Sequence, residues 1–289
     1  MEKSITIIGG DLRQCYAAEY FRMLGWQTTC WHTPEFPFHS DIYAAGSLRD
    51  AVEHSRLILA PAPLTRDGNN LFQPESIPFH CSLDSLWAEL NADHTLAALS
   101  LNDTQKQILN SKGCKTLTFG SYDFFTAENA VLTAEGLLAE VIRYTPFSLS
   151  SANMLLLGFG RCGSAIGRLF HPLCRGIYLL EQDPQRQALA KSSSLFPVTA
   201  EDLPQILPQC QILINTIPAP VLEPSALCLL HHSCHIFDIA SAPCGFPEDT
   251  TRKCLLPYYR LPGIPGRFSP VTAGELIGRT IERMTEHVL

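Results

Sequence analysis

Several features are missing from this chain of 289 residues, and each absence excludes a class of protein. No apolar run approaches the roughly 20 residues that a membrane-spanning helix needs, so we expect no membrane partner. The chain has no long basic run and a formal net charge of −7, which argues against nucleic acid as a partner. The segment before the first apolar strand lacks the features of a signal peptide, so we expect a cytoplasmic protein.

The sequence also lacks a CxxC pair, although it holds 11 cysteines. The simplest interpretation is a set of reduced thiols that are buried or half-buried. The segment His231-His232-Ser233-Cys234-His235 offers zinc ligands, but it falls where a helix should turn into a strand. We interpret it as a polar turn and expect no metal site.

What the sequence does contain is a repeated alternation of strands and helices. Hydrophobic residues make up 46% of the chain, which is enough for a substantial core. Short apolar segments such as 5–8 and 154–157 alternate with helical patterns such as 14–24 and 128–144, which is typical of parallel sheets covered on both faces. The predicted fold class is α/β with two doubly wound domains, the second a Rossmann dinucleotide-binding domain, linked by long helices.

The connector Ser148-Leu149-Ser150-Ser151 gives the predicted domain boundary. Residues 1–147 then form a flavodoxin-like domain for a substrate or partner, and residues 148–270 form the Rossmann domain for NAD(P). Residues 271–289 hold a last amphipathic helix, which we expect to pack back on the N-terminal domain.

The most informative segment is an apolar strand that stops in a glycine turn and opens a helix. Gly158 permits the tight turn, Gly160 lets the backbone approach a ligand closely, and Gly163 lets the helix pack on the strand. Free N–H groups and the helix dipole then face a pyrophosphate; the alternative is a plain tight βα turn. The residues expected to contact the coenzyme here are Gly158, Gly160, Arg161, Cys162 and Gly163.

An acidic residue at the end of the second strand of such a domain binds the adenosine ribose. Glu181 holds that position, 23 residues after Gly158 (181 − 158 = 23). Its carboxylate would repel a 2′-phosphate and so favours NAD over NADP. The alternatives are a surface acid without this role, or Asp183 in its place.

Two further strand ends should face the same crevice, because ligands bind beyond the carboxyl ends of parallel strands. Thr216 and Pro218 follow one strand, and Asp238, Ala240 and Ser241 end or follow the next. We expect them to line the nicotinamide half of the site, with Ser241 toward the substrate. Asp238 has an alternative interpretation as the cap of the following turn.

Near the N-terminus, Gly9-Gly10-Asp11-Leu12-Arg13-Gln14 repeats the strand–glycine–helix pattern. Gly10 brings backbone N–H groups close to whatever lies above the strand, and Arg13 suits a carboxylate. Arg13 on a solvated helix face is the alternative. Asp11 caps the helix, with or without a role at the substrate.

The segment 259–270 reads as a rigid, irregular loop rich in proline and glycine, which shapes a site or is only a sharp connector. It contains Gly263 and Arg267. Thr272 then begins the last helix and offers N–H groups to an anion.

Six motifs, in order along the chain, together resemble one family, the A subunit of dipicolinate synthase. They are Gly9-Gly10-Asp11-x-Arg13-Gln14, Thr133-Ala134-Glu135-Gly136, Gly158-Phe159-Gly160-Arg161-x-Gly163, Asn215-Thr216-Ile217-Pro218, Asp238-Ile239-Ala240-Ser241-x-Pro243, and Leu261-Pro262-Gly263-x-Pro265-Gly266 through Pro270-x-Thr272-Ala273-Gly274. Many dehydrogenases share the nucleotide turn, whereas the first and last motifs are much narrower.

The resemblance implies an enzyme of the mother cell of endospore-forming bacteria. It implies NAD(P)-dependent oxidation of dihydrodipicolinate, from the lysine pathway, to pyridine-2,6-dicarboxylate, together with a flavoprotein-like B subunit. Arg13, Arg267 and helix N-termini, with Gly10, Gln14, Ser241, Gly263 and Thr272 nearby, would then hold this dicarboxylate. The proton acceptor would be Asp11 or Glu135, although Glu135 could instead make only a helix-end or interdomain hydrogen bond.

The chain departs from the family pattern at two places. An Arg that suits NADP is replaced by Glu181-Gln182, and Ala242-Pro243-Cys244-Gly245 replaces a more basic or glycine-rich form. Both NAD and NADP therefore stay open as coenzymes. The sequence also leaves open whether the chain forms a homo-oligomer. The rival interpretations are a non-catalytic nucleotide-binding regulatory subunit and a dehydrogenase of another small carboxylic acid.

Overall fold

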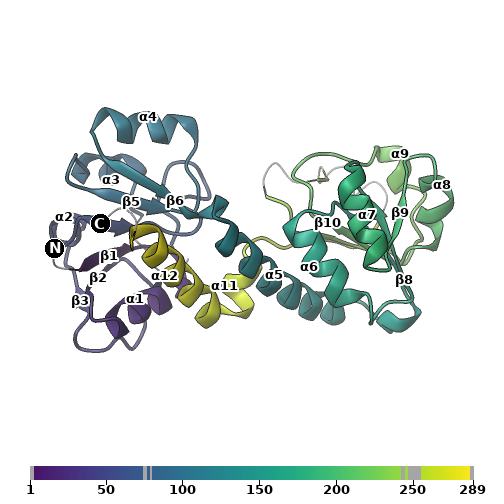
Figure 1. Ribbon diagram of the computed structural model, residues 1–289, viewed down its shortest axis with the longest axis horizontal. Coiled ribbons are helices and arrows are strands. Elements are labelled where there is room, and N and C mark those ends of the chain that lie inside the picture. Colours follow the sequence, from purple (N-terminus) through teal and green to yellow (C-terminus); the bar gives the residue numbers. More distant parts are fainter. Residues whose placement is uncertain (1–2, 74–76, 79, 242–244, 247–254, 287–289) are drawn as a thin grey trace. The chain divides into compact units, whose positions relative to one another are not determined.

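The computed structural model describes the chain except for residues 1–2, 74–76, 79, 242–244, 247–254 and 287–289. Residues 1–129 with 269–289 form one compact unit, the first unit, and residues 130–268 form the second unit (Figure 1). Each unit contains a six-stranded parallel sheet. The predicted α/β class, with two doubly wound sheets, is confirmed.

The first sheet has the strand order β3-β2-β1-β4-β5-β6. Its strands are β1 Ser4–Ile8, β2 Gln27–Trp31, β3 Tyr43–Ala44, β4 Leu57–Leu59, β5 Thr95–Ala98 and β6 Lys115–Thr118. The helices of this unit are α1 Leu12–Met23, α2 Leu48–Glu53, α3 Leu83–Glu89, α4 Asp103–Ser111, η1 Phe119–Ser121 and α12 Pro270–Glu286. Without the two-residue edge strand β3, the other five strands follow the flavodoxin-like order 2-1-3-4-5.

The second sheet has the order β12-β11-β10-β7-β8-β9, which read from β9 is the Rossmann order 3-2-1-4-5-6. Its strands are β7 Asn153–Leu157, β8 Gly176–Leu180, β9 Phe196–Val198, β10 Ile212–Asn215, β11 His235–Asp238 and β12 Tyr258–Arg260. Its helices are α6 Arg161–Phe170, α7 Pro184–Ser192, α8 Leu203–Ile206, α9 Pro224–Leu227 and α11 Ile264–Phe268, with the 3-10 turns η2 Leu149–Ser151 and η3 Leu207–Gln209. The order of the strands reverses between β7 and β10, where ligands of such sheets bind.

The central strand β7 shows why its sequence is an unbroken apolar run. Met154 and Leu156 point into one hydrophobic core, and Leu155 and Leu157 point into another on the opposite face of the sheet. Side chains alternate between the two faces of a strand, so a strand that is buried on both sides needs apolar residues throughout.

The long helix α5, Asp123–Tyr144, begins earlier than the predicted segment 128–144 and contains the division between the units. Ala130, Ala134, Leu137 and Val141 lie on one face of α5 and are buried in the core of the second unit. The units therefore divide after residue 129, whereas the connector near residue 148 placed the boundary later.

The last helix, α12, packs against α1 in the first unit (Figure 1). Two glycines on α12 make this close approach feasible. A Cβ on Gly274 would lie 2.5 Å from the carbonyl oxygen of Arg13, and one on Gly278 would lie 2.4 Å from the ring of Tyr20. The hydroxyl of Tyr20 donates a hydrogen bond to Glu282 at 2.6 Å, which ties the same two helices together.

Four short elements correct the sequence interpretation. The irregular loop predicted for 259–270 contains the helix α11, in which Pro265 sits in the first turn where its missing N–H costs nothing. The strand expected at 255–258 is instead β12 at Tyr258–Arg260, and the short strands β3 and β9 were not predicted. Elements of two to five residues carry too few side chains to show a period.

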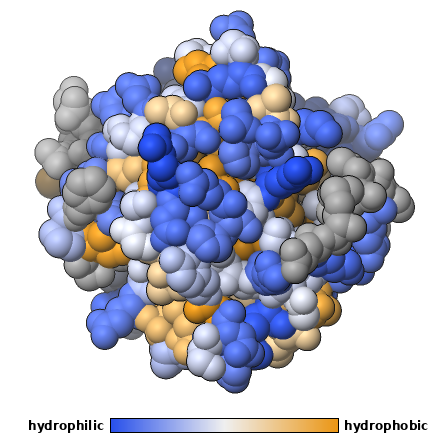
Figure 2. Space-filling model, turned by 90° about the vertical axis from the view of Figure 1, so that its left-hand side faces the viewer, coloured by the Kyte–Doolittle hydropathy of each residue, from blue (hydrophilic) through white to orange (hydrophobic). Residues whose placement is uncertain are grey.

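Hydrophilic residues cover most of the face of the first unit in Figure 2, and hydrophobic residues form small scattered patches there. Scattered apolar residues are normal on a protein surface and indicate no particular partner. Within the described residues, no helix has the length and apolar character needed to cross a bilayer.

Candidate functional site

The turn from β7 into α6 requires glycine at two positions. Gly158 has a φ of +87°, and a Cβ there would lie 2.7 Å from side-chain atoms of both Thr216 and Ile217. A Cβ on Gly163 would lie 2.1 Å from the carbonyl oxygen of Gly158. Glycine at these two positions therefore lets the turn pack closely, at Gly158 against the residues that follow β10 and at Gly163 against the turn's own backbone.

Gly160, between those two glycines, has a different environment. A Cβ built there would meet no described atom within 4 Å, and no described side chain caps α6, of which Gly160 is the N-cap. The first N–H groups of a helix have no partner within the helix, and the dipole of this 10-residue helix favours an anion at that end. The space and the donors together fit the pyrophosphate of a dinucleotide.

Glu181 lies directly beside this turn. One carboxylate oxygen accepts a hydrogen bond from the N–H of Phe159 at 2.8 Å, and the other accepts from Gln182 at 2.8 Å and Asp183 at 3.0 Å. Burial works to raise the pKa of Glu181, but these three N–H groups and Arg186 outweigh it, so the pKa lies below its ordinary value. An ionised carboxylate accepts about four hydrogen bonds, which leaves about one for a ribose hydroxyl.

Asp183, the competitor for that role, caps α7 instead. Its carboxylate accepts hydrogen bonds from the backbone N–H of Gln185 at 2.8 Å and of Arg186 at 3.4 Å. This capping function accounts for the acid at position 183 without a ligand.

Asp238 and Asn215 are both fully buried and hydrogen-bond each other at 2.9 Å. Asp238 also accepts from the N–H of Ala240 at 3.0 Å, the N–H of Gly245 at 3.1 Å and the hydroxyl of Tyr258 at 3.2 Å. Four protein donors thus occupy the carboxylate, which holds the loops beyond β10 and β11 rather than offering a free acceptor. Asn215 belongs to the motif Asn215-Thr216-Ile217-Pro218, but nothing in the sequence indicates its partnership with Asp238.

The other residues expected near the nicotinamide differ in exposure. The hydroxyl of Thr216 donates to the carbonyl of Leu157 at 2.8 Å, which fixes its side chain at the end of β10. Ala240 is buried, whereas Pro218 and Ser241 are exposed. The segment 242–244 that follows Ser241 lies outside the described residues.

The glycine turn of the first unit, after β1, is covered by other parts of the chain. The N–H of Gly9 donates to Trp31 at 2.9 Å, and the N–H of Gly10 donates to the carbonyl of Phe72 at 2.7 Å. A Cβ on Gly9 would lie 3.0 Å from both Phe72 and Pro61. These backbone donors therefore already have partners and are not available to a nucleotide.

Arg13 is buried, with 7% of its surface exposed, so it does not lie on a solvated helix face. Its guanidinium donates to both carboxylate oxygens of Asp11, at 2.8 Å each, and to the carbonyl of Ala62. Asp11 also caps α1, as its position before the helix indicates. The side-chain nitrogen of buried Gln14 has no hydrogen-bond partner among the residues that the structure describes.

Arg267, expected to bind substrate, is paired with a glutamate that the sequence analysis missed. Its guanidinium donates to the carboxylate of Glu140, which is wholly buried on α5. Glu135, on the same helix, is exposed. A glutamate within an amphipathic helix normally indicates the solvated face, so nothing in the sequence marked Glu140 as buried.

Two further residues expected at the substrate are exposed. Gly263, with a φ of +66°, belongs to the second unit, and Thr272, near the start of α12, belongs to the first. Gly136 of the Thr133-Ala134-Glu135-Gly136 motif has a packing role, because a Cβ there would lie 2.3 Å from Ile264 of α11.

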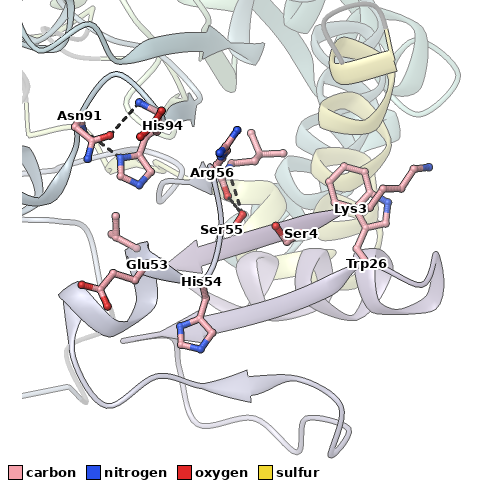
Figure 3. A pocket seen from close by; sticks show the side chains of 12 residues that line it. Lys3, Ser4, Trp26, Glu53, His54, Ser55, Arg56, Asn91 and His94 are labelled. Carbon is pink, nitrogen blue, oxygen red and sulfur yellow. Dashed lines mark hydrogen bonds between the residues drawn. The ribbon is translucent and has the colours of Figure 1, made fainter. Parts of the chain in front are cut away.

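A cavity of about 800 Å³ lies at the amino ends of β1, β4 and β5 in the first unit. Trp26, Lys3, Arg56 and His94 are among its lining residues (Figure 3). Burial lowers the pKa of His94, whose ring accepts a hydrogen bond from the N–H of Asn91 at 3.1 Å. The Gly9-Gly10 turn lies at the carboxyl end of β1, so the cavity is at the other end of these strands. Its lining includes none of the residues expected at a substrate or coenzyme.

The histidine-rich segment 231–235 forms local contacts. The ring of His231 lies 2.7 Å from the hydroxyl of Ser233, and Cys234 is fully buried. Over the part of the chain that the structure describes, no group of three or more His, Cys, Asp and Glu side chains is arranged to hold a metal ion.

Comparison with known proteins bears out the resemblance. Residues 4–119 match the family model for the N-terminal domain of the A subunit of dipicolinate synthase. The corresponding A subunit of Bacillus subtilis (strain 168) is 26% identical over 160 residues, which cover 55% of this chain and 54% of that protein. The match thus spans about half the length of the curated relative. The predicted resemblance to the A subunit of dipicolinate synthase is confirmed.

Solved structures show the same fold over nearly the whole chain. The crystal structure of the dipicolinate synthase A subunit from Bacillus halodurans has a TM-score of 0.87 at 21% identity and covers 98% of each chain. The D-lactate dehydrogenase of Lactobacillus jensenii, solved with NAD⁺, has a TM-score of 0.55 at 11% identity and covers 96% of this chain and 94% of its own. The fold is thus shared with the dipicolinate synthase A subunit and with this D-lactate dehydrogenase.

Proposed function

We propose that the chain oxidises dihydrodipicolinate to dipicolinate (pyridine-2,6-dicarboxylate) with NAD(P), in the cytoplasm of the mother cell of a sporulating bacterium. A flavoprotein-like B subunit of dipicolinate synthase would be its partner. The observation that carries the proposal is the turn from Gly158 to Gly163, where a Cβ on Gly160 would meet no described atom within 4 Å and no described side chain caps α6. The resemblance to the A subunit of dipicolinate synthase supplies the substrate.

The coenzyme would lie along the carboxyl ends of β7, β8 and β10. Its pyrophosphate would rest on the N–H groups of residues 160–163, with Arg161 and Cys162 at the helix start, and its ribose on Glu181. The ionised carboxylate of Glu181 repels a 2′-phosphate, which favours NAD over NADP. Thr216, Pro218 and Ala240 would line the nicotinamide half, and Asp238 would hold their loops in place.

The bound nicotinamide supplies the hydride acceptor, and loss of one hydride and one ring proton turns the dihydropyridine ring into an aromatic pyridine. The protein then mainly has to bind and orient a flat diacid. Arg267 would face one carboxylate, with Ser241 and Gly263 of the same unit nearby. The guanidinium of Arg13 and the N–H of Gly10 already have partners within the protein, so we do not assign them to the substrate.

Glu135 is a better candidate for the proton acceptor than Asp11. Both carboxylate oxygens of Asp11 already accept hydrogen bonds from Arg13, whereas Glu135 is exposed on α5. A group that receives a proton must be able to reach it, either directly or through one water molecule.

Incubating the purified chain with dihydrodipicolinate and either coenzyme, with and without the B subunit, tests the proposal. Reduced coenzyme should form with the chain alone, faster with NAD than with NADP. Coenzyme binding without turnover under both conditions would instead indicate a regulatory subunit. Turnover confined to another small acid would indicate a different dehydrogenase.

A further inference from the structure

The strongest unexplained feature of the second unit is a buried carboxylate on α5. Glu140 has 0% of its surface exposed, and one of its oxygens accepts a hydrogen bond from the guanidinium of Arg267 on α11. Its second oxygen has no hydrogen-bond partner within the described ranges, and the guanidinium of Arg143 lies 3.9 Å from it. A carboxylate in this position carries a considerable desolvation penalty.

This ion pair is not needed to attach α11 to the unit. Ile264 and Pro265 of α11 are already buried, and Gly136, one turn before Glu140 on α5, lets Ile264 approach closely. An apolar side chain at position 140 would extend the same contact without the desolvation penalty, because buried ion pairs are often replaceable by packed apolar residues. Packing of α11 alone therefore does not account for this pair.

What the pair fixes is the direction of the Arg267 guanidinium. Arg267 is only partly covered, with 46% of its side chain exposed. One of its guanidinium nitrogens is held by Glu140, and the guanidinium carbon lies 5.3 Å from the ring centre of Phe268. The segment 261–268 follows the carboxyl end of β12, the end of the sheet at which ligands bind. A planar guanidinium that is held on one edge presents its other N–H groups in a fixed geometry, which suits a carboxylate.

We propose that Glu140 is a positioning residue, which orients Arg267 to receive one carboxylate of a planar dicarboxylic acid. This inference rests on the proposed function for its substrate, but it concerns a residue that the proposed function does not use. Glu140 would contribute to diacid affinity through Arg267 alone and would not affect the coenzyme turn.

Four variants test this role: Glu140→Gln, Arg267→Gln, the double variant, and Glu89→Gln as a control that removes one partner of the exposed Arg49–Glu89 pair. KM and kcat for dihydrodipicolinate, calorimetric Kd for pyridine-2,6-dicarboxylate and for pyridine-2-carboxylate, and Kd for NADH are measured for each. The monocarboxylate serves as a probe that lacks the second acid group.

Glu140→Gln should raise KM and the Kd of the diacid about tenfold, with kcat changed less than twofold and the Kd of NADH unchanged. The same variant should bind the monocarboxylate as the wild type does. The double variant should bind the diacid with the same Kd as Arg267→Gln, because Glu140 acts only through that guanidinium. Glu89→Gln should match the wild type throughout.

Equal weakening of diacid, monoacid and NADH binding by Glu140→Gln, with a lower Tm, would show a merely structural role and overturn the inference. So would unchanged diacid binding in the folded variant. If Glu140→Gln does not fold, Arg267→Lys replaces it as the test variant. Lysine keeps the positive charge beside Glu140 but loses the planar, forked set of N–H donors. A raised KM for dihydrodipicolinate at an unchanged Tm is then expected, and an unchanged KM would overturn the inference. A wild type that binds NADH but neither binds nor oxidises the diacid would refute the proposed function itself.

Discussion

The two glycine turns of this chain have the same place in the fold and opposite surroundings. Each follows the first strand of its sheet and opens a helix, at Gly9-Gly10 before α1 and at Gly158–Gly163 before α6. In both turns the first glycine donates its N–H to the neighbouring strand, Gly9 to Trp31 and Gly158 to Leu180. In the first turn, however, Gly10 also donates to Phe72, and Asp11 caps the helix. In the second turn no described atom lies within 4 Å of the Cβ position of Gly160, and no described side chain caps the helix. A strand–glycine–helix pattern therefore predicts a turn, and only its surroundings show whether the turn can bind a nucleotide.

The covered turn should respond to substitution through stability. Gly10 has a φ of +84°, and a Cβ there would lie 2.3 Å from the side-chain oxygen of Gln14. Gly10→Ala should lower the free energy of unfolding by about 3 kcal/mol. This value is the sum of the cost of a left-handed backbone conformation for alanine and the cost of an overpacked contact. Chemical denaturation measures this loss, and the surviving folded protein should bind NADH with the wild-type Kd. A weaker Kd without any loss of stability would contradict the account.

The open turn should respond through coenzyme affinity instead. Gly160 has a φ of −71° and no described atom within 4 Å of its Cβ position, so Gly160→Val should fold with a Tm only slightly below that of the wild type, because valine is less favourable than glycine at an N-cap. The added side chain blocks the approach of a pyrophosphate, and the Kd of NADH should rise about 100-fold. Gly46→Val is the matched control, since Gly46 has no described atom closer than 3.9 Å to its Cβ position and lies in the first unit. An unchanged Kd of NADH in Gly160→Val would show that the coenzyme does not bind at this turn.

Coenzyme selectivity sharpens the comparison, because only the open turn has an acid at the end of the next strand. The wild type should prefer NADH to NADPH, and Glu181→Ala should lose about a factor of ten of that preference. Fluorescence titration of both coenzymes against both proteins gives the four constants. Equal preference in the two proteins would remove Glu181 from the site.

A smaller effect concerns pH. The N–H groups that hold Glu181 outweigh its burial and lower its pKa, so folding favours the ionised form. Its contribution is present above the ordinary pKa of a glutamate and is lost as the pH falls through the lower folded value. The stability advantage of the wild type over Glu181→Gln should therefore shrink below about pH 4. Thermal unfolding at a series of pH values checks this, and a difference that stays constant to the lowest pH would contradict it.

The sequence alone predicts the longer strands, the α/β alternation and the position of the glycine turn at 158–163, and it does so for physical reasons. Met154 to Leu157 form an apolar run because both faces of β7 are buried, and the three glycines 158, 160 and 163 follow at the spacing that the fold needs. These are local patterns, which one strand and one helix determine between them.

What the sequence does not predict depends on contacts between distant residues. Phe72 covers the first turn from a segment rich in proline, glycine and asparagine, with no pattern that specifies where it packs. Asp238 has four donors from three separate segments, and Glu140 is buried on a helix where a glutamate normally faces solvent. The sequence does not show which carboxylates and guanidinium groups already have partners within the protein and are therefore not free to bind a ligand.

The most direct test of the contrast between the two turns is a crystal structure of the chain grown with NADH. The account predicts a diphosphate on the N–H groups of residues 160–163, with the adenosine ribose on Glu181, and the Gly9-Gly10 turn still covered by Phe72. A diphosphate at the Gly9-Gly10 turn, or a turn at Gly160 that carries no coenzyme at saturating NADH, would contradict it.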